Sequence, residues 1–63
     1  MFARGSGMED KLKFKRVKYD GYTYWIDKER LCFIWKYPGM NEVCYYFDEP
    51  LGIAILNNGI FYN

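Results

Sequence analysis

Turn-forming residues interrupt this chain at short intervals and leave room only for brief extended segments between them. Asp20-Gly21 and Asn58-Gly59 are hairpin signals, and Pro38–Asn41 is a strong turn. Asp27–Arg30 and Asp48–Pro50 are further polar breaks. The runs between these breaks are rich in Tyr, Phe, Trp, Ile and Val, which is the composition of strands. The pattern therefore predicts an all-β fold.

We expect five or six strands, and the breaks place them at residues 11–19, 22–26, 31–37, 42–47, 52–57 and 60–63. Because all the links are short, the strands should form an antiparallel meander. Rolling that meander into a small barrel, similar in size to SH3-like and OB-like barrels, would protect its edges. A short helix within residues 8–15 is the alternative for the start of the domain, since Glu9-Asp10 precede Leu12.

The length of 63 residues allows one domain, which we place at residues 11–63. Aromatic residues make up 22% of the chain and can supply the core that so small a domain needs. Residues 1–10 are expected to be a flexible lead-in, and residues 1–7 have the composition of a linker, either native or left from an expression tag. No secretory signal is apparent, and the longest apolar run, Ile53–Leu56, is far shorter than a membrane helix.

Alternation along the strands predicts two faces of the sheet. The loop lengths place Tyr19 opposite Tyr22, and Val17 opposite Tyr24. The next two loops place Tyr24 opposite Phe33 and Trp35 opposite Cys44. The first face, the expected core, then contains Val17, Tyr19, Tyr22, Tyr24, Ile26, Leu31, Phe33, Trp35, Tyr37, Cys44 and Tyr46.

The second predicted face combines large aromatic side chains with cations where a small domain would ordinarily be polar. These candidate partner-binding residues are Trp25, Tyr45, Phe47, Arg16, Lys18 and Lys36. Aromatic residues with Arg are typical of protein interfaces, including those of homo-oligomers. The same residues could stack the bases of single-stranded nucleic acid, or a nucleotide, and hold its phosphates. A third alternative is that the rest of the chain covers this face.

The basic segment at residues 11–18 bears on the choice between these partners. Lysines that alternate along a first strand usually protect a sheet edge, and we favour this reading over a phosphate track. The net charge of only +1 also weighs against sequence-independent nucleic-acid binding.

The two cysteines and the missing histidine limit the chemistry. Cys32 and Cys44 fall on opposite predicted faces, so a disulfide between them is not expected, and free thiols favour a reducing, cytoplasmic location. The chain has no histidine, which excludes Ser-His and Cys-His nucleophiles and zinc sites of the Cys₂His₂ and Cys₃His types. Two cysteines cannot form a Cys₄ site without a second chain. The Asp48-Glu49 pair beside Pro50 is typical of a solvated turn.

We therefore expect no enzymatic activity, no metal and no cofactor. The sequence favours a non-catalytic protein-interaction module, a small inhibitor or regulator of the kind that phages encode. Binding of single-stranded nucleic acid or a nucleotide is the alternative.

Overall fold

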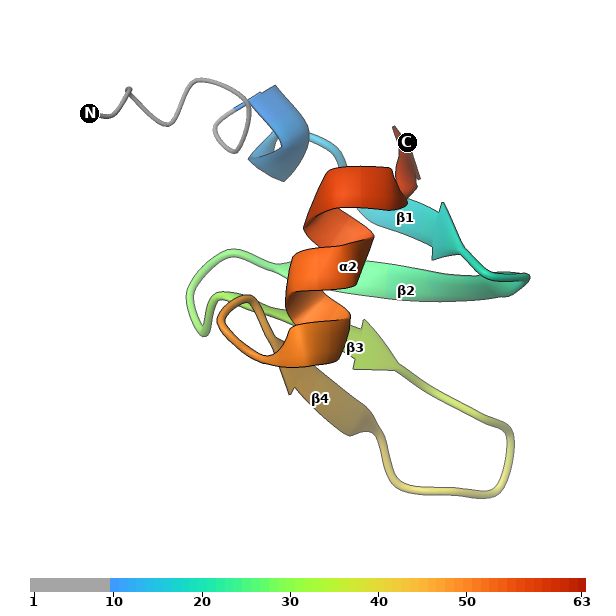
Figure 1. The fold of residues 1–63 in the computed structure, drawn as a ribbon. Coiled ribbons are helices and arrows are strands. Elements are labelled where there is room, and N and C mark those ends of the chain that lie inside the picture. Colours follow the sequence, from blue (N-terminus) through green and yellow to red (C-terminus); the bar gives the residue numbers. More distant parts are fainter. Residues whose placement is uncertain (1–9) are drawn as a thin grey trace.

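The computed structural model describes residues 10–63, which form a five-stranded antiparallel sheet with one helix across one side (Figure 1). The elements are β1 (Arg16–Tyr19), β2 (Tyr22–Asp27), β3 (Cys32–Trp35), β4 (Val43–Tyr46), α2 (Pro50–Asn58) and β5 (Ile60–Tyr62). The strand order is β4-β3-β2-β1-β5. The predicted antiparallel meander is thus confirmed for the first four strands. The sheet stays open, so the closed barrel is not formed.

The β1–β2 hairpin matches the prediction residue by residue. Tyr19 pairs with Tyr22, and Val17 pairs with Tyr24. Asp20 and Gly21 take left-handed φ angles of 52° and 83°, as a tight two-residue hairpin turn requires. This turn depends on two adjacent residues alone, which is why the sequence predicted it so well.

The β2–β3 hairpin is shifted from the predicted register by two residues. Ile26 pairs with Phe33, and Asp27 pairs with Cys32, so the loop spans residues 28–31. Leu31 closes this loop with a left-handed φ of 58°. A shift of two residues preserves the alternation, so β3 presents the predicted side chains to each face.

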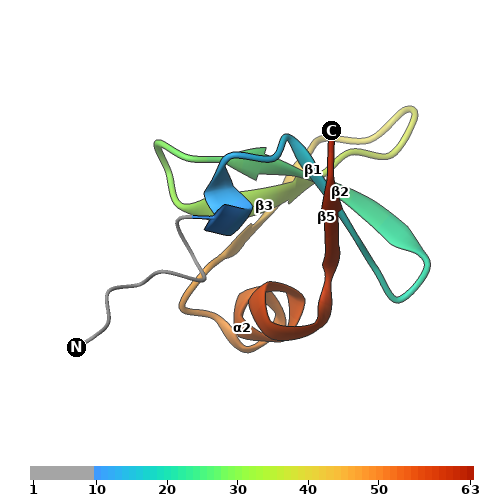
Figure 2. The same ribbon diagram turned by 90° about the horizontal axis from the view of Figure 1, so that it is seen from above.

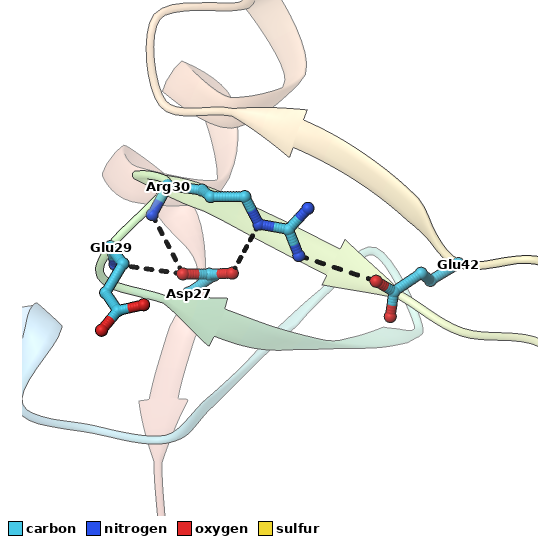
Figure 3. A network of polar contacts seen from close by, with 4 residues as sticks. All are labelled: Asp27, Glu29, Arg30 and Glu42. Carbon is cyan, nitrogen blue, oxygen red and sulfur yellow. Dashed lines mark hydrogen bonds and ion pairs between the residues drawn. The ribbon is translucent and has the colours of Figure 1, made fainter.

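A polar network around Asp27 holds this loop (Figure 3). The Asp27 carboxylate accepts hydrogen bonds from the backbone N–H groups of Glu29 and Arg30 and from Arg30 Nε. Arg30 Nη2 also lies 3.6 Å from Glu42 Oε1, which links the loop to the segment before β4. The hydrogen bonds from the Arg30 backbone and side chain lower the pKa of Asp27. Asp27 therefore stabilises the fold above its unfolded-state pKa, and that contribution is lost as the pH falls through the lower folded value.

The β3–β4 hairpin departs from the predicted register by one residue. Trp35 pairs with Val43 instead of Cys44, and the connection occupies residues 36–42. A shift of one residue exchanges the two faces of a strand. The predicted faces of β4 are therefore wrong: Tyr45 points to the helix side, whereas Cys44 and Tyr46 point away from it.

The segment predicted as a strand at 52–57 is helical instead. Pro50 occupies the first turn of α2, where its missing N–H costs nothing. Leu51 and Ile55, four residues apart, lie on one side of the helix and contact the core. The helical spacing of these residues and the proline at the start were signals that the strand prediction overlooked.

The helix carries the chain across the sheet from one edge to the other. It follows β4 and delivers β5 to the opposite edge, beside β1, where Phe61 pairs with Val17 (Figures 1 and 2). The expected hairpin at Asn58-Gly59 is consequently absent from the structure, and β5 is three residues long.

The core lies between the sheet and α2. Its buried members are Val17, Tyr24, Phe33, Phe47 and Ile55. The Phe33 ring centroid lies 4.8 Å from that of Phe47 and 6.2 Å from that of Phe61, so three aromatic rings from β3, β5 and the end of β4 meet there.

The first strand begins later than predicted, at Arg16. Residues 10–12 form a helical turn, in agreement with the alternative of a short helix in this region. Leu12 from this turn contacts the core. Most of the predicted lead-in, and the linker-like residues 1–7, lie outside the described residues.

Candidate functional site

The sheet face that points away from α2 is the first candidate surface, and we call it the outer face. Among the predicted binding residues, Arg16, Lys18 and Trp25 lie there together. The register adds side chains from β3, β4 and β5. The outer face comprises Arg16, Lys18, Thr23, Trp25, Asp27, Cys32, Ile34, Cys44, Tyr46, Ile60 and Tyr62.

Arg16 is the centre of this face. It pairs with Trp25 on one side and with Tyr62 on the other, and its guanidinium carbon lies 5.2 Å and 5.0 Å from their ring centroids. Its Nη2 donates a hydrogen bond to the Asn63 carbonyl oxygen. Arg16 Nε is buried and has no hydrogen-bond partner within residues 10–63. The two cation–π contacts hold the guanidinium between two rings and thereby order this part of the face.

The other predicted binding residues lie elsewhere. Tyr45 packs on the helix side, with its ring perpendicular to that of Tyr24 at 6.0 Å. Phe47 is buried against Phe33. Lys36 follows the end of β3 in an exposed loop. The structure therefore does not place Tyr45 and Phe47 beside Trp25, because the β4 prediction was one residue out of register.

Two tyrosines that the sequence did not assign to this face lie on it: Tyr46 pairs with Cys32, where Phe47 was expected, and Tyr62 pairs with Arg16. Both arise from registers that the sequence did not predict, those of β4 and β5. Trp25 is 47% exposed and Tyr46 is 43% exposed, so the outer face presents two large aromatic side chains to solvent.

The two cysteines share the outer face, which corrects the prediction of opposite faces. Cys32 pairs with Tyr46 and Cys44 pairs with Ile34, so the cysteines are diagonal neighbours on β3 and β4. Both thiols are free. Burial, with a further contribution from Cys44, raises the pKa of Cys32 to about 11. The buried thiol is therefore neutral at physiological pH and a poor nucleophile.

This raised pKa predicts an alkaline loss of stability. The unfolded thiol ionises near its ordinary pKa of 9.0, whereas the folded one stays protonated to about 11. The contribution of Cys32 to the free energy of unfolding is complete below pH 9.0 and is lost as the pH rises through about 11. We expect the urea denaturation midpoint of the wild-type protein to decrease as the pH rises from 9.0 to about 11. The midpoint of Cys32→Ala, compared with its own value at neutral pH, should decrease less over the same range. An equal alkaline loss in the variant would contradict this assignment to Cys32.

A second candidate site lies on the helix side of the sheet, where α2 leaves part of the sheet uncovered. Figure 1 shows the β1–β2 turn and the β3–β4 loop extending past α2 on the same side. A pocket of about 300 Å³ opens there. We call it the aromatic pocket, and its lining residues are Tyr19, Asp20, Tyr22, Tyr24, Trp35, Tyr45 and Leu51.

The sequence placed four of these aromatic residues on one face but treated them as core. Tyr24 is nearly buried, whereas Tyr22 is 50% exposed. The nine-residue α2 is too short to cover all of these aromatic side chains, and the uncovered ones form the pocket. The large number of aromatic residues on the predicted core face was the sequence signal that could have indicated this pocket.

Comparisons with protein-family models, with curated proteins and with solved structures find no match for this chain. Within residues 10–63, no group of three or more Cys, Asp or Glu side chains is arranged to hold a metal ion. None of the helices in that range is long and apolar enough to cross a membrane.

Proposed function

We propose that this protein is a non-catalytic interaction module that binds another protein through its outer face. The observation that carries the proposal is the exposed Trp25 beside Arg16 and Tyr62, on a sheet face that α2 does not cover. Trp, Tyr and Arg are the residues that most often dominate binding energy at interfaces. Arg16 is already fixed between two rings, so little side-chain entropy is lost when a partner binds.

The charge of the outer face indicates the chemistry of the partner. Ion pairs within residues 10–63 join Arg30 to Asp27 and Glu42, and none involves Arg16 or Lys18. A complementary partner would thus present an apolar patch with carboxylates at its rim. A reducing compartment such as the cytoplasm suits the two free thiols.

Nucleic-acid binding is the second candidate, supported by the exposed Trp25 next to Lys18 and Arg16. The guanidinium of Arg16 already occupies a face of Trp25 and of Tyr62, so a base that stacks there has to displace it or use the outward side. This contact favours a protein partner over a single strand.

The test compares Trp25→Ala with Tyr37→Ala, because the Tyr37 side chain is 53% exposed and lies outside the outer face. Partners captured by cross-linking are identified, purified and titrated by calorimetry against each variant. We expect Tyr37→Ala to bind like the wild type and Trp25→Ala to bind roughly 30-fold more weakly, the effect of an interface hot spot.

Other outcomes would overturn the proposal. Equal affinity of both variants for the purified partner would remove the outer face from the interface. Binding to a mixed-sequence oligonucleotide that weakens steeply with salt and is lost in Trp25→Ala would instead establish the nucleic-acid function. A stable homodimer by light scattering, disrupted by Trp25→Ala, would assign this face to self-association.

A further inference from the structure

The aromatic pocket lies on the opposite side of the sheet from the outer face and has a distinct chemistry. The residues that line it are five aromatic residues, one leucine and one acidic residue, Asp20, with no lysine or arginine. Aromatic ring faces carry partial negative charge and attract cations. The composition of the pocket therefore favours a positively charged group and disfavours an anion.

The arrangement of the rings suits a compact cation. Tyr22 and Trp35 are perpendicular, at 87° with centroids 5.7 Å apart, and Tyr24 and Tyr45 are perpendicular at 81°. Perpendicular pairs form corners, so the pocket has walls in more than one direction. The nearly buried Tyr24 provides an ordered base, and the more exposed Tyr22 borders the opening.

Asp20 adds a full negative charge at the same place. Its carboxylate makes no ion pair with any residue from 10 to 63. The left-handed turn conformation fixes its backbone at the end of the β1–β2 hairpin, next to the pocket. Burial, followed by the nearby Tyr45, Tyr22 and Asp20, raises the pKa of Tyr24, so its hydroxyl stays neutral at physiological pH.

The size of the pocket limits the ligand. A volume of about 300 Å³ is at the lower end of the range for small-molecule sites. It accommodates a headgroup better than an extended molecule. A bare ammonium loses strong hydration on entering such a site, and aromatic rings do not replace the hydrogen bonds that it made with water. A weakly hydrated cation with a large apolar surface loses less hydration and therefore gains most from the site.

We infer that the aromatic pocket binds a quaternary ammonium group, such as the trimethylammonium of choline or of a trimethylated lysine side chain. Tyr22, Trp35 and Tyr45 contact the cation through their rings, and Asp20 balances its charge. This site is independent of the proposed protein-binding face, so either can fail without the other.

The experiment uses tryptophan fluorescence in a Trp25→Phe background, which leaves Trp35 as the reporter in the pocket. The ligands are choline, free Nε-trimethyl-lysine, unmodified lysine and 3,3-dimethyl-1-butanol, the neutral isostere of choline. We expect saturable changes with both trimethylammonium ligands, and binding of the isostere weaker by roughly 10-fold or more. The cation that binds more tightly identifies the source of the ligand. Choline indicates a small metabolite or a headgroup, and trimethyl-lysine indicates a modified protein.

Two variants test the individual groups. Asp20→Asn keeps the turn, because Asn-Gly is the preferred sequence for this hairpin, and should weaken choline binding several-fold. Tyr22→Leu removes one exposed ring and should weaken it similarly, whereas Tyr46→Ala, on the outer face, should have no effect. Equal binding of choline and its isostere would overturn the inference. So would the lack of a saturable signal with either cation, or wild-type affinity in both pocket variants.

Discussion

Replacing Gly52 by alanine should unfold this protein or leave it barely stable. A Cβ at Gly52 would overlap the carbonyl oxygen of Tyr46, and it would lie 2.7 Å from the Tyr46 carbonyl carbon and 3.1 Å from Phe47 Cα. These are backbone atoms at the end of β4, so they cannot move aside as a side-chain tip can. We expect a loss of about 3 kcal/mol or more, the upper range for overpacking.

The sign of this prediction is what makes it informative. Helix propensity alone predicts that Gly→Ala within α2 stabilises the protein by about 1 kcal/mol. The close approach of α2 to β4 predicts the opposite. Urea denaturation followed by circular dichroism separates the two, with Ile53→Ala, at an exposed neighbouring position, as the control. A Gly52→Ala protein as stable as the wild type would show that α2 does not pack against β4 as described.

Phe33→Ala is expected to have the second large effect. Phe33 is fully buried, and its ring contacts Phe47 and Phe61. Truncation of a buried phenylalanine costs about 3–5 kcal/mol. A domain of this length has a total stability of about 3–9 kcal/mol, so the variant should be largely unfolded.

A graded variant keeps this prediction measurable if Phe33→Ala does not fold. Phe33→Leu retains most of the apolar volume, so its midpoint in urea should lie between those of the wild type and Phe33→Ala. Met40→Ala, at a loop residue that is 55% exposed, should shift the stability by no more than about 0.5 kcal/mol. If Phe33→Ala behaved like Met40→Ala, the three-ring cluster would not be the centre of the core.

The parts of the fold that were predictable are those that depend on local residues. The β1–β2 register follows from Asp20-Gly21 alone, and it is the register that placed Arg16, Lys18 and Trp25 on one face. The positions of Tyr45 and Phe47 required the correct length of two successive loops. The second of these loops is longer than the Pro38–Asn41 turn within it. The resulting register error of one residue exchanged the two faces of β4.

The remaining errors have a different physical origin. The segment from Pro50 to Asn58 has apolar residues at strand-like density, and only its spacing and its first residue distinguish it from a strand. The aromatic pocket could not be predicted, because it depends on how much of the sheet α2 covers. Coverage is a property of tertiary packing, which neither propensity nor alternation determines.

The pairing of β1 with β5 also has a consequence for how the chain acquires its structure during synthesis. Val17 emerges from the ribosome well before Phe61, the residue with which it pairs. The meander from β1 to β4 can assemble from local hairpins, but the β1 edge and the part of the Phe33 ring that faces Phe61 stay uncovered until residues 60–62 arrive. At translation rates of about 5–20 residues per second, this leaves a nascent sheet edge unpaired for seconds, during which chaperones or a binding partner can reach it.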